Sequence, residues 1–425
     1  QMNELLDRYR VERNEDITYA AFQSPFELLT EIEKGIRPDI LFLDVVMPGQ
    51  NGMDVAKEIR QYDTNMKIIF LTSSPEFAVE SLKRLVEGGY NVVAVVTQPD
   101  KPVGRHQDTL QPSQVKQYAV EHGLPVLQPV KMKDPDFVEQ LRSYQADLQV
   151  VVAFRMLPEV VWAMPKYGTF NVHAALLPQY RGAAPINWAV INGEKETGVT
   201  TFFLDHDIDT GRIILQKRFP IPETANVEYV YDGLMHLGAE LALETIDALI
   251  AADGNIGSIP QSEMIGQGAE LKPAPKIFKD TCRIDFHKPA KQVYDFIRGL
   301  SPYPGAWTEI KKKETVVFFD DPKGDDDHVR FPEPTTHPSH KQSTQKIQVL
   351  KIFSTRLSCM KRGDAPVGSL RVEGKSLQVA CLDEWLIIQE LQLSGKKRMD
   401  ASAFLNGMKD IAYYECLKKD VSDDF

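Results

Sequence analysis

The string Lys67-Ile68-Ile69-Phe70-Leu71 decides how this chain of 425 residues folds, because α/β units run in both directions from it. On its N-terminal side, an apolar strand pattern at residues 39–46 is followed by a helical pattern at residues 52–62. On its C-terminal side come a helical pattern at residues 75–88 and a strand pattern at residues 91–96. This alternation predicts a parallel sheet with helices on its faces. A strand has only two edges, so residues 67–71 cannot serve two complete sheets.

Composition is that of a globular protein with several domains. Apolar residues make up 43% of the chain, yet no apolar run approaches the roughly 20 residues that cross a bilayer, which excludes a membrane protein. The net charge of −11 argues against a uniformly basic surface, but the first 75 residues alone hold thirteen acidic and eight basic residues. Four cysteines without a Cys-x-x-Cys pair predict buried or idle thiols in a reducing compartment. No export signal is visible at the start, so we expect a cytoplasmic protein.

The C-terminal part differs from the rest in its pattern. Residues 254–279 are rich in glycine and proline and are typical of a linker. Short strand patterns after it predict a β-rich domain, within which the polar residues 322–345 favour a flexible insertion over a metal site. The other predicted elements are helices at residues 113–122, 136–143 and 227–252, and strands at residues 125–127, 148–154, 213–215, 316–319, 347–353 and 385–391.

Asp44 stands in the run Ile40-Leu41-Phe42-Leu43-Asp44-Val45-Val46-Met47-Pro48-Gly49-Gln50-Asn51-Gly52, near the carboxyl end of a buried strand. An aspartate that caps a turn is the alternative. The run resembles the phosphoacceptor region of response-regulator receiver domains, which implies that Asp44 is the phosphorylated residue and Thr72 the switch hydroxyl. The acidic pair and the lysine of that family are absent, so the resemblance implies a truncated receiver fragment. We expect it to be inactive, because nothing neutralises the phosphoryl oxygens.

A second constellation lies at the strand end Phe170-Asn171-Val172-His173, where the period of two puts Asn171 and His173 on one face. A loop of small residues follows and lets a ligand approach the backbone. Asp209 lies 36 residues past His173, and we prefer it to Asp205 and Asp207 because it directly precedes the Thr210-Gly211 turn. A structural Asn and His with an Asx-turn aspartate is the alternative.

Asn, His and Asp side chains together suit acyl transfer to an amine without a covalent intermediate. When an amine attacks a formamide-like carbonyl, negative charge develops on oxygen, and an Asn amide and a protonated imidazole can donate hydrogen bonds to it. A nearby carboxylate favours the charged imidazole and can orient a water or accept the amine proton. This chemistry needs no Ser or Cys nucleophile.

From about residue 75 to the end, the chain resembles the methionyl-tRNA formyltransferases. The resemblance rests on the strand end at residues 170–173, on Leu176-Leu177-Pro178, on Arg181-Gly182-Ala183-Ala184-Pro185-Ile186 and on Ile208-Asp209-Thr210-Gly211. It implies transfer of the formyl group of 10-formyltetrahydrofolate to the amino group of methionyl initiator tRNA, with no metal. It also implies that Asn171, His173 and Asp209 are catalytic and that Ala175, Leu176, Leu177 and Pro178 contact the folate.

The resemblance assigns further parts of the chain to the tRNA. The loop with Lys101 and Arg105 is similar to an insertion that meets the acceptor end, Arg181 is a further substrate contact, and the C-terminal domain resembles a small tRNA-holding barrel. Three departures from the family pattern stand out: Ser73-Ser74 for Gly-Thr, Ala175 for Ser, and His106-Gln107-Asp108 where lysines are common. The lost glycine removes φ freedom, and the lost lysines weaken phosphate attraction.

The expected fold is a doubly wound, Rossmann-like α/β domain with a C-terminal β-barrel and an N-terminal, partial receiver-like fragment. The transferase sheet offers more strands, so we predict that residues 67–71 form its central strand, between residues 91–96 and 148–154, and that residues 1–65 are docked loosely or disordered. We expect a monomer. The expected boundaries are residues 1–66 for the fragment, 67–253 for the catalytic domain, 254–279 for the linker and 280–425 for the barrel.

Two other functions stay open. A related folate-dependent formyltransferase acting on a nucleotide or an amino sugar shares the Asn, His and Asp arrangement, but it does not need the Lys101 loop or the barrel. A signalling switch driven by Asp44 belongs to a different class, and the missing acidic pair speaks against it.

Overall fold

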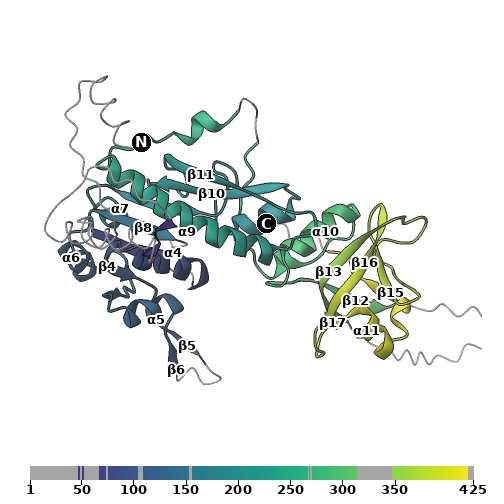
Figure 1. Cartoon of the computed structure of the whole chain (residues 1–425). Helices are drawn as coiled ribbons and strands as arrows, with labels where there is room; N and C mark the ends of the chain where they lie inside the picture. Colours follow the sequence, from purple (N-terminus) through teal and green to yellow (C-terminus); the bar gives the residue numbers. More distant parts are fainter. Residues whose placement is uncertain are drawn as a thin grey trace, which may run out of the picture. The chain divides into compact units, whose positions relative to one another are not determined.

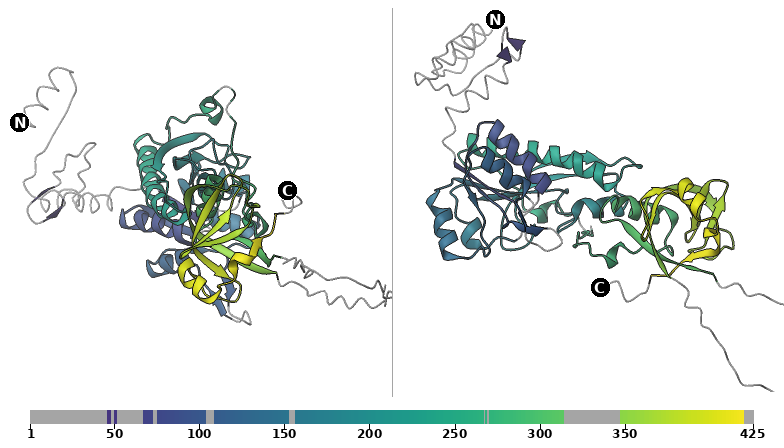
Figure 2. Two further views of the ribbon diagram at one scale, coloured as in Figure 1. Left: turned by 90° about the vertical axis from the view of Figure 1, so that its right-hand side faces the viewer. Right: turned by 90° about the horizontal axis from the view of Figure 1, so that it is seen from below.

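The computed structural model describes residues 46–47, 50–51, 67–72, 75–103, 109–152, 156–266, 268, 270–313 and 347–419. Contacts between Cα atoms divide the chain into two compact units (Figures 1 and 2). The first unit comprises residues 1–171 and 242–256, and the second comprises residues 172–241 and 257–425. The chain passes from the first unit to the second within strand β9 (Thr169–His173).

The first unit is built on a parallel sheet whose central strand is β3 (Lys67–Thr72). Its neighbours are β4 (Asn91–Val96) and β8 (Leu148–Val152), and both run parallel to it. The sheet continues beyond β4 with β7 (Val126–Leu127) and beyond β8 with β9. The predicted place of residues 67–71, between residues 91–96 and 148–154, is therefore confirmed.

The same pairing answers the competition for residues 67–71. Both edges of β3 are taken by strands that follow it in the chain, so its role is that of a first central strand. Asp44 and all but the last residue of the strand predicted at residues 39–46 lie outside the described residues, as does most of the segment at residues 1–65. The described residues that follow Asp44 form a short antiparallel pair, β1 (Val46–Met47) and β2 (Gln50–Asn51).

Three helices of the first unit begin within one residue of their predicted starts, whereas the short helix at residues 159–162 was not predicted. α4 (Pro75–Glu87) starts at its proline, which suits the first turn because the N–H that proline lacks would have no helical partner there. Ser113 caps α5 (Gln114–Glu121), since its Oγ accepts a hydrogen bond of 3.2 Å from the Lys116 amide. α6 (Pro135–Ser143) and α7 (Glu159–Trp162) follow, and β5 (Lys101–Val103) and β6 (Thr109–Gln111) form a separate antiparallel hairpin.

The second unit holds β9's end, β10 (Glu196–Phe203) and β11 (Ile213–Pro220), in the sheet order β9-β10-β11. β10 and β11 are antiparallel, and Thr200 pairs with Gln216 in their register. α8 (Pro185–Ile191) leads from the loop after β9 into β10. α9 (Val227–Ala251) begins in this unit and ends one residue before the predicted end of its helix.

The C-terminal part of the second unit is a β-barrel, as predicted. Its strands follow the order β14-β15-β16-β13-β12-β18, and a bridge between Ser369 and Glu415 joins the two edges. Apolar side chains such as Leu350, Leu386 and Ile388 fill the interior. The strands are β12 (Ala306–Lys312), β13 (Gln348–Lys361), β14 (Leu370–Glu373), β15 (Ser376–Ala380), β16 (Glu384–Leu393), β17 (Met399–Asp400) and β18 (Tyr414–Cys416), with helices α10 (Ala290–Gly299) and α11 (Ala401–Gly407) and the short helices η2 (Asp280–Cys282) and η3 (Ile411–Tyr413).

Residues 257–276, which lie within the predicted linker at residues 254–279, contain secondary structure and pack against the second unit. They contain the short helix η1 (Gln261–Met264), and Ile259 forms a bridge to Ile213. Gln261 is 3% exposed and Ala274 is fully buried, so the segment packs against the unit rather than crossing solvent. The strand predicted at residues 316–319 and the polar residues 322–345 lie outside the described residues. No helix in the described ranges is long and apolar enough to cross a membrane.

Candidate active site

His173 ends β9 and is only 6% exposed. Its Nε2 lies 2.9 Å from the backbone carbonyl oxygen of Tyr180, and because a carbonyl can only accept, Nε2 carries a hydrogen. The imidazole and the buried ring of Phe202 are nearly perpendicular, with 6.4 Å between the ring centroids. The ring is thereby fixed in orientation, and Nδ1 is the nitrogen left for chemistry.

Asp209 supplies the carboxylate that faces this nitrogen. Its Oδ2 lies 3.7 Å from Nδ1 of His173 and accepts a hydrogen bond of 3.0 Å from the amide of Gly182. The backbone of Asp209 has a φ of +55°, a left-handed conformation that non-glycine residues adopt at a cost. This turn conformation sends the carboxylate toward the end of β9.

The two neighbouring aspartates do not reach the histidine. Asp205 accepts hydrogen bonds from the amide of Asp207 and from the hydroxyl of Thr210, so it caps the turn that carries Asp209. Asp205 and Asp207 are both exposed. The structure thus places Asp209, the preferred residue of the three, beside His173.

Asn171 lies two residues before His173 on β9, and strand alternation gives both side chains the same face. The Oδ1 atom of Asn171 is buried and has no hydrogen-bond partner in the part of the chain that the structure describes. A buried amide oxygen without a partner is costly, and a bound substrate that donates to it would remove that cost. Rotation of the amide presents its NH₂ group in the same place.

Thr200, which was not predicted from the sequence, supports the loop that is expected to contact folate. Thr200 on β10 donates to the carbonyl of Ala175 at 2.7 Å and accepts from the amide of Leu177 at 3.1 Å. Gln216, its cross-strand partner, donates to the carbonyl of Leu177 at 2.8 Å and to the Thr200 hydroxyl at 2.9 Å. Leu176 and Pro178 lie in the same loop. Polar residues inside buried strands were the available signal for this pair.

Gln261 is a third supporting residue that was not predicted from the sequence. Its Nε2 donates to the carbonyls of Asp209 and Gly211, both at 2.8 Å. Its Oε1 accepts from Nε and Nη2 of Arg181 at 3.0 and 2.6 Å. Arg181, which was expected to contact the substrate, therefore has two of its donors engaged within the protein.

Tyr180 links the site to a polar cluster. Its hydroxyl donates to Glu194 at 2.5 Å, and Lys272 approaches the same carboxylate oxygen at 2.6 Å. Burial, followed by the bond to Glu194, raises the pKa of Tyr180 above the ordinary value of a phenol. The hydroxyl therefore stays protonated at neutral pH and serves as a fixed donor.

The loop residues expected to meet tRNA are described in part. Lys101 begins β5 in the first unit, while Arg105 lies outside the described residues. Lys116 anchors the root of this hairpin, because its ammonium lies 2.6 Å from Asp100. The Gln128 amide and this ammonium together lower the pKa of the Asp100 carboxyl.

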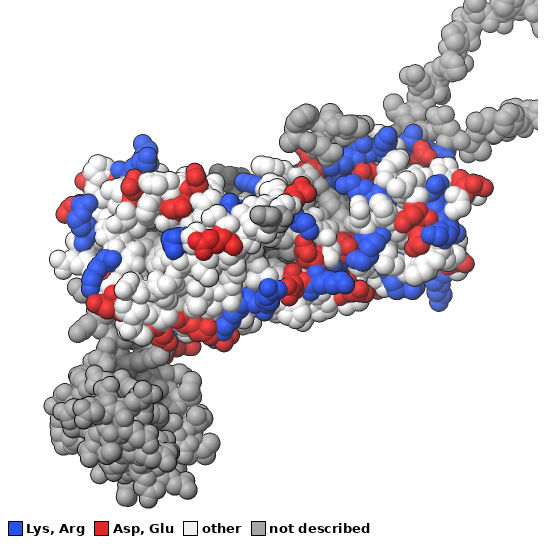
Figure 3. Space-filling view, turned by 90° about the horizontal axis from the view of Figure 1, so that it is seen from above, with Lys and Arg blue, Asp and Glu red and all other residues white. Residues whose placement is uncertain are grey.

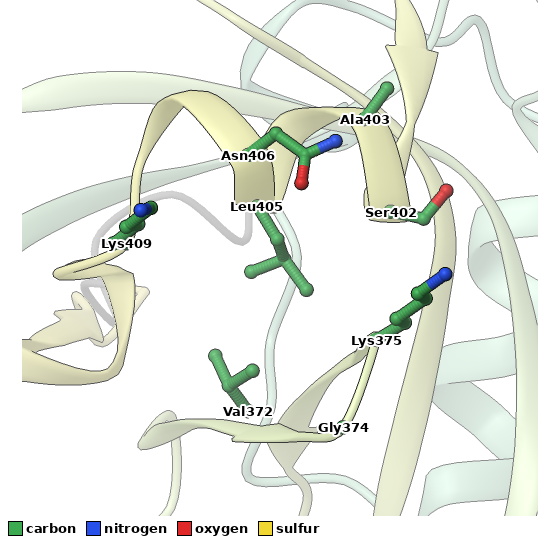
Figure 4. Close-up of a pocket in the computed structure, with 8 residues that line it drawn as sticks. All are labelled: Val372, Gly374, Lys375, Ser402, Ala403, Leu405, Asn406 and Lys409. Atoms are coloured by element: carbon green, nitrogen blue, oxygen red, sulfur yellow. The ribbon is translucent and has the colours of Figure 1, made fainter.

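A cavity of about 450 Å³ lies away from these residues, in the C-terminal barrel (Figure 4). Val372 and Leu405 point into it from β14 and α11, and Lys375 and Lys409 stand at its border together with Asn406. It contains neither an imidazole nor a carboxylate, so it is no candidate for the formyl-transfer chemistry. In the described ranges, no group of three or more His, Cys, Asp or Glu side chains is placed to hold a metal ion.

Profiles of known protein families match almost the whole chain. The profile of the family "Formyl transferase" matches residues 66–246, and that of "Formyl transferase, C-terminal domain" matches residues 276–409. The profile "Response regulator receiver domain" matches residues 3–94 and so overlaps the first of these. The overlap contains β3, whose two neighbours in the sheet belong to the formyltransferase match.

Individual proteins give the same family. "Methionyl-tRNA formyltransferase" of Parabacteroides distasonis is 55% identical over 351 residues, which are 82% of this chain and 98% of that protein. The protein of that name from Bacteroides thetaiotaomicron is 51% identical over 346 residues, 81% of this chain and 96% of the relative. A crystal structure of WlaRD, described as a sugar 3N-formyl transferase, superposes with a TM-score of 0.50 at 18% identity, covering 78% of this chain and all of that one, and thus shares the fold. The chain therefore belongs to the methionyl-tRNA formyltransferase family.

Proposed function

We propose that this chain transfers the formyl group of 10-formyltetrahydrofolate to the free amino group of methionyl initiator tRNA. The observation that carries the proposal is the geometry around His173, whose Nδ1 lies 3.7 Å from the carboxylate of Asp209. This chain matches nearly the whole length of relatives that carry the name of this activity, which supports the same assignment.

The reaction forms one C–N bond and breaks another. The methionyl nitrogen attacks the formyl carbon, the bond from that carbon to folate N10 breaks, and the proton lost by the amine arrives on N10. The distance of 3.7 Å exceeds a hydrogen bond, so His173 and Asp209 can each bond to one reacting atom or water beside them. With Nδ1 protonated, His173 donates to the oxygen that gains negative charge, and Asp209 accepts the amine proton.

Asn171 completes the proposed set of catalytic residues. Its side-chain oxygen has no partner among the described residues, and the side chain lies on the face shared with His173. In one orientation of the amide, the NH₂ group can donate to the formyl oxygen. In the flipped orientation, the amide oxygen can accept from the attacking amine. The proposed folate site is the loop from Ala175 to Pro178, where buried Ala175 and Leu177 leave backbone groups as the polar contacts. The site requires no metal for this chemistry.

We assign the tRNA to Lys101, Arg105 and Arg181 and to the C-terminal barrel. Figure 3 shows Lys and Arg side chains gathered over the barrel's surface, with Asp and Glu among them. The lysines beside the barrel cavity, Lys375 and Lys409, would meet phosphate groups. The proposed division remains a fragment (residues 1–66), a catalytic domain (67–253), a connecting segment (254–279) and a barrel (280–425). We further propose a cytoplasmic monomer in which Asp44 takes no part in phosphotransfer.

One assay tests the proposed function. The chain is incubated with 10-formyltetrahydrofolate and initiator tRNA charged with methionine, and formyl-methionine is measured after hydrolysis of the tRNA. A nucleotide-linked amino sugar serves as the competing acceptor. Formylation of the tRNA that is lost in His173→Ala is the expected result, whereas formylation of the amino sugar alone would overturn the proposal.

A further inference from the structure

Gln261 is a buried glutamine in a segment that composition marks as a connector. It is 3% exposed and opens the short helix η1, which Pro260 precedes. A glutamine amide has two N–H donors and an oxygen with two lone pairs. A buried amide is stable only where these groups find partners, so the identity of its partners reveals what the residue does.

All four hydrogen-bonding positions of Gln261 are occupied, and every partner belongs to the candidate active site. The two donors bond to the backbone carbonyls on either side of Thr210, those of Asp209 and Gly211, at 2.8 Å each. The oxygen accepts two hydrogen bonds from the guanidinium of Arg181, at 3.0 and 2.6 Å. One side chain thus joins the turn that carries Asp209 to the loop that follows β9.

These two segments together fix the carboxylate of Asp209. The turn holds the residue at a φ of +55°, which an unsupported backbone rarely adopts. The loop contributes the amide of Gly182, next to Arg181, which donates to Oδ2 of Asp209 at 3.0 Å. The same oxygen lies 3.7 Å from Nδ1 of His173. A shift between the turn and the loop would therefore move the carboxylate relative to the imidazole.

The loop is supported from the same connecting segment at a second point. The amide of Ala274 donates to the carbonyl of Arg181 at 2.8 Å, and a side chain at Gly182 would meet the Ala274 carbonyl oxygen at 2.4 Å. These contacts hold the loop against residues 272–274. Gln261 fixes the distance between that loop and the turn that carries Asp209.

We propose that Gln261 is a positioning residue for formyl transfer, which holds the Asp209 carboxylate in place against His173 through the Asp209 and Gly211 carbonyls and Arg181. The inference rests on the proposed function of this site. Gln261 itself touches no reacting atom in this account, and its effect passes through Asp209.

The barrel offers a matched control in Gln378. It is also 3% exposed, and its Oε1 also accepts from Nε and Nη2 of one arginine, Arg371, at 3.1 and 2.7 Å. Gln378→Met therefore removes an equivalent buried glutamine–arginine pair outside the catalytic residues. Gln261→Met keeps the shape and removes every hydrogen bond, while Gln261→Glu keeps an acceptor for Arg181 and replaces the two donors with an acceptor oxygen that the carbonyls of Asp209 and Gly211 repel.

The experiment measures kcat, KM for each substrate and the urea midpoint for the three variants, alone and in an Asp209→Asn background. We expect both Gln261 variants to lose roughly 10- to 100-fold in kcat, since a misplacement of about 1 Å has that effect, while both KM values stay within about threefold. In the Asp209→Asn background, the Gln261 change should lower kcat no further. Gln378→Met should lower the urea midpoint and leave kcat unchanged.

Two results would overturn the inference: a kcat of Gln261→Met equal to that of Gln378→Met, or an equal further loss in the Asp209→Asn background. A readout without turnover separates this from the proposed function. The side-chain ¹⁵N signals of His173, assigned with His173→Gln, should move in Gln261→Met and stay in place in Gln378→Met. Unmoved signals in Gln261→Met reject the positioning role, whether or not the parent chain formylates tRNA.

Discussion

His173 and Asp209 face each other across 3.7 Å, from Nδ1 to Oδ2, although they are 36 positions apart in the chain. Neither side chain bonds directly to the other, and each has a separate backbone anchor, the Tyr180 carbonyl for the imidazole and the Gly182 amide for the carboxylate. Both anchors lie in the one loop that follows β9. The loop is therefore the common frame of the pair, and a change in it would displace both groups.

Asp209→Asn tests the charge of this pair. The asparagine oxygen can still accept from the Gly182 amide, so the loop geometry is retained while the carboxylate is lost. We expect kcat to fall about 10²- to 10⁴-fold, the usual effect of removing a general base, with the urea midpoint close to that of the parent. Asp207→Asn, on the exposed side of the same turn, is the control and should keep full activity. An active Asp209→Asn enzyme would remove the carboxylate from the mechanism.

Thr200→Val tests the support of the folate loop. Valine keeps the shape but loses the hydroxyl that bonds to the Ala175 carbonyl, the Leu177 amide and the Gln216 amide. Leaving the buried Ala175 carbonyl and Leu177 amide without this partner costs about 1–3 kcal/mol of unfolding free energy. We expect folate binding to weaken by a similar energy, which raises KM for 10-formyltetrahydrofolate about tenfold. KM for tRNA should stay unchanged.

The control for this change lies on the same strand. Thr197 is buried on β10, and its hydroxyl has no partner among the described residues, so Thr197→Val should be neutral or stabilising. Equal effects of the two substitutions on the folate KM would show that the Thr200 hydroxyl does not hold the loop.

Much of the sheet was predictable from residues 67–96, because each element there is a contiguous run with its own cap or turn. The central place of β3 also followed, since a strand has two edges and the strands at residues 91–96 and 148–152 occupy both. Asn171, His173 and Asp209 could be predicted as candidate site residues because each stands in a compact local motif. The residues that hold these side chains and their loops in place could not be predicted from the sequence.

That support is tertiary and carries no local pattern. Thr200 reaches a loop 23 to 25 positions away, and Gln261 reaches Asp209 over 52 positions. Residues 254–279 look like a linker because they are rich in glycine and proline, yet their backbone and Gln261 bond to the site. Composition reports the freedom of a segment by itself, and the partners that remove that freedom lie elsewhere in the chain.

Gly211→Ala tests how tightly the aspartate turn lies against β10. A Cβ at this position would stand 1.7 Å from the backbone oxygen of Phe203, and main chain cannot yield as a flexible side chain can. The amide of Phe203 also bonds to the carbonyl of Arg212 at 3.0 Å, which keeps the two backbones together. We expect a loss of more than about 2 kcal/mol in unfolding free energy, measured in urea, together with lost activity. Gly257→Ala, where nothing lies within 4 Å, is the control, and a comparable loss there would contradict the steric account.

Lys375→Ala with Lys409→Ala tests the barrel cavity as a phosphate contact. Each lysine that neutralises a phosphate contributes about 1 to the slope of log affinity against log salt, so the double variant should lower that slope by about 2. We expect weaker tRNA binding in proportion, with an unchanged KM for 10-formyltetrahydrofolate. Lys133→Ala, on an exposed loop of the first unit, serves as the control. An unchanged salt slope in the double variant would place the tRNA elsewhere.

The four cysteines should separate into one reactive thiol and three protected ones. Cys359 is exposed, while Cys282, Cys381 and Cys416 are buried. Burial raises the pKa of Cys381 and of Cys416 to about 12, so at pH 8 almost none of either is thiolate. A thiol reagent should therefore label one cysteine quickly in the folded protein, and Cys359→Ser should abolish that phase.

The same shifts predict how stability depends on pH. Unfolding returns these thiols to an ordinary pKa near 9, so above pH 9 the unfolded chain binds fewer protons than the folded one. Their contribution to stability is complete below pH 9 and declines as the pH rises from 9 toward 12. Urea midpoints measured from pH 8 to 11 should fall less steeply in Cys381→Ala, once corrected for the lower starting stability of that variant. A slope identical to that of the parent would show that the Cys381 thiol is not held in its neutral form by burial.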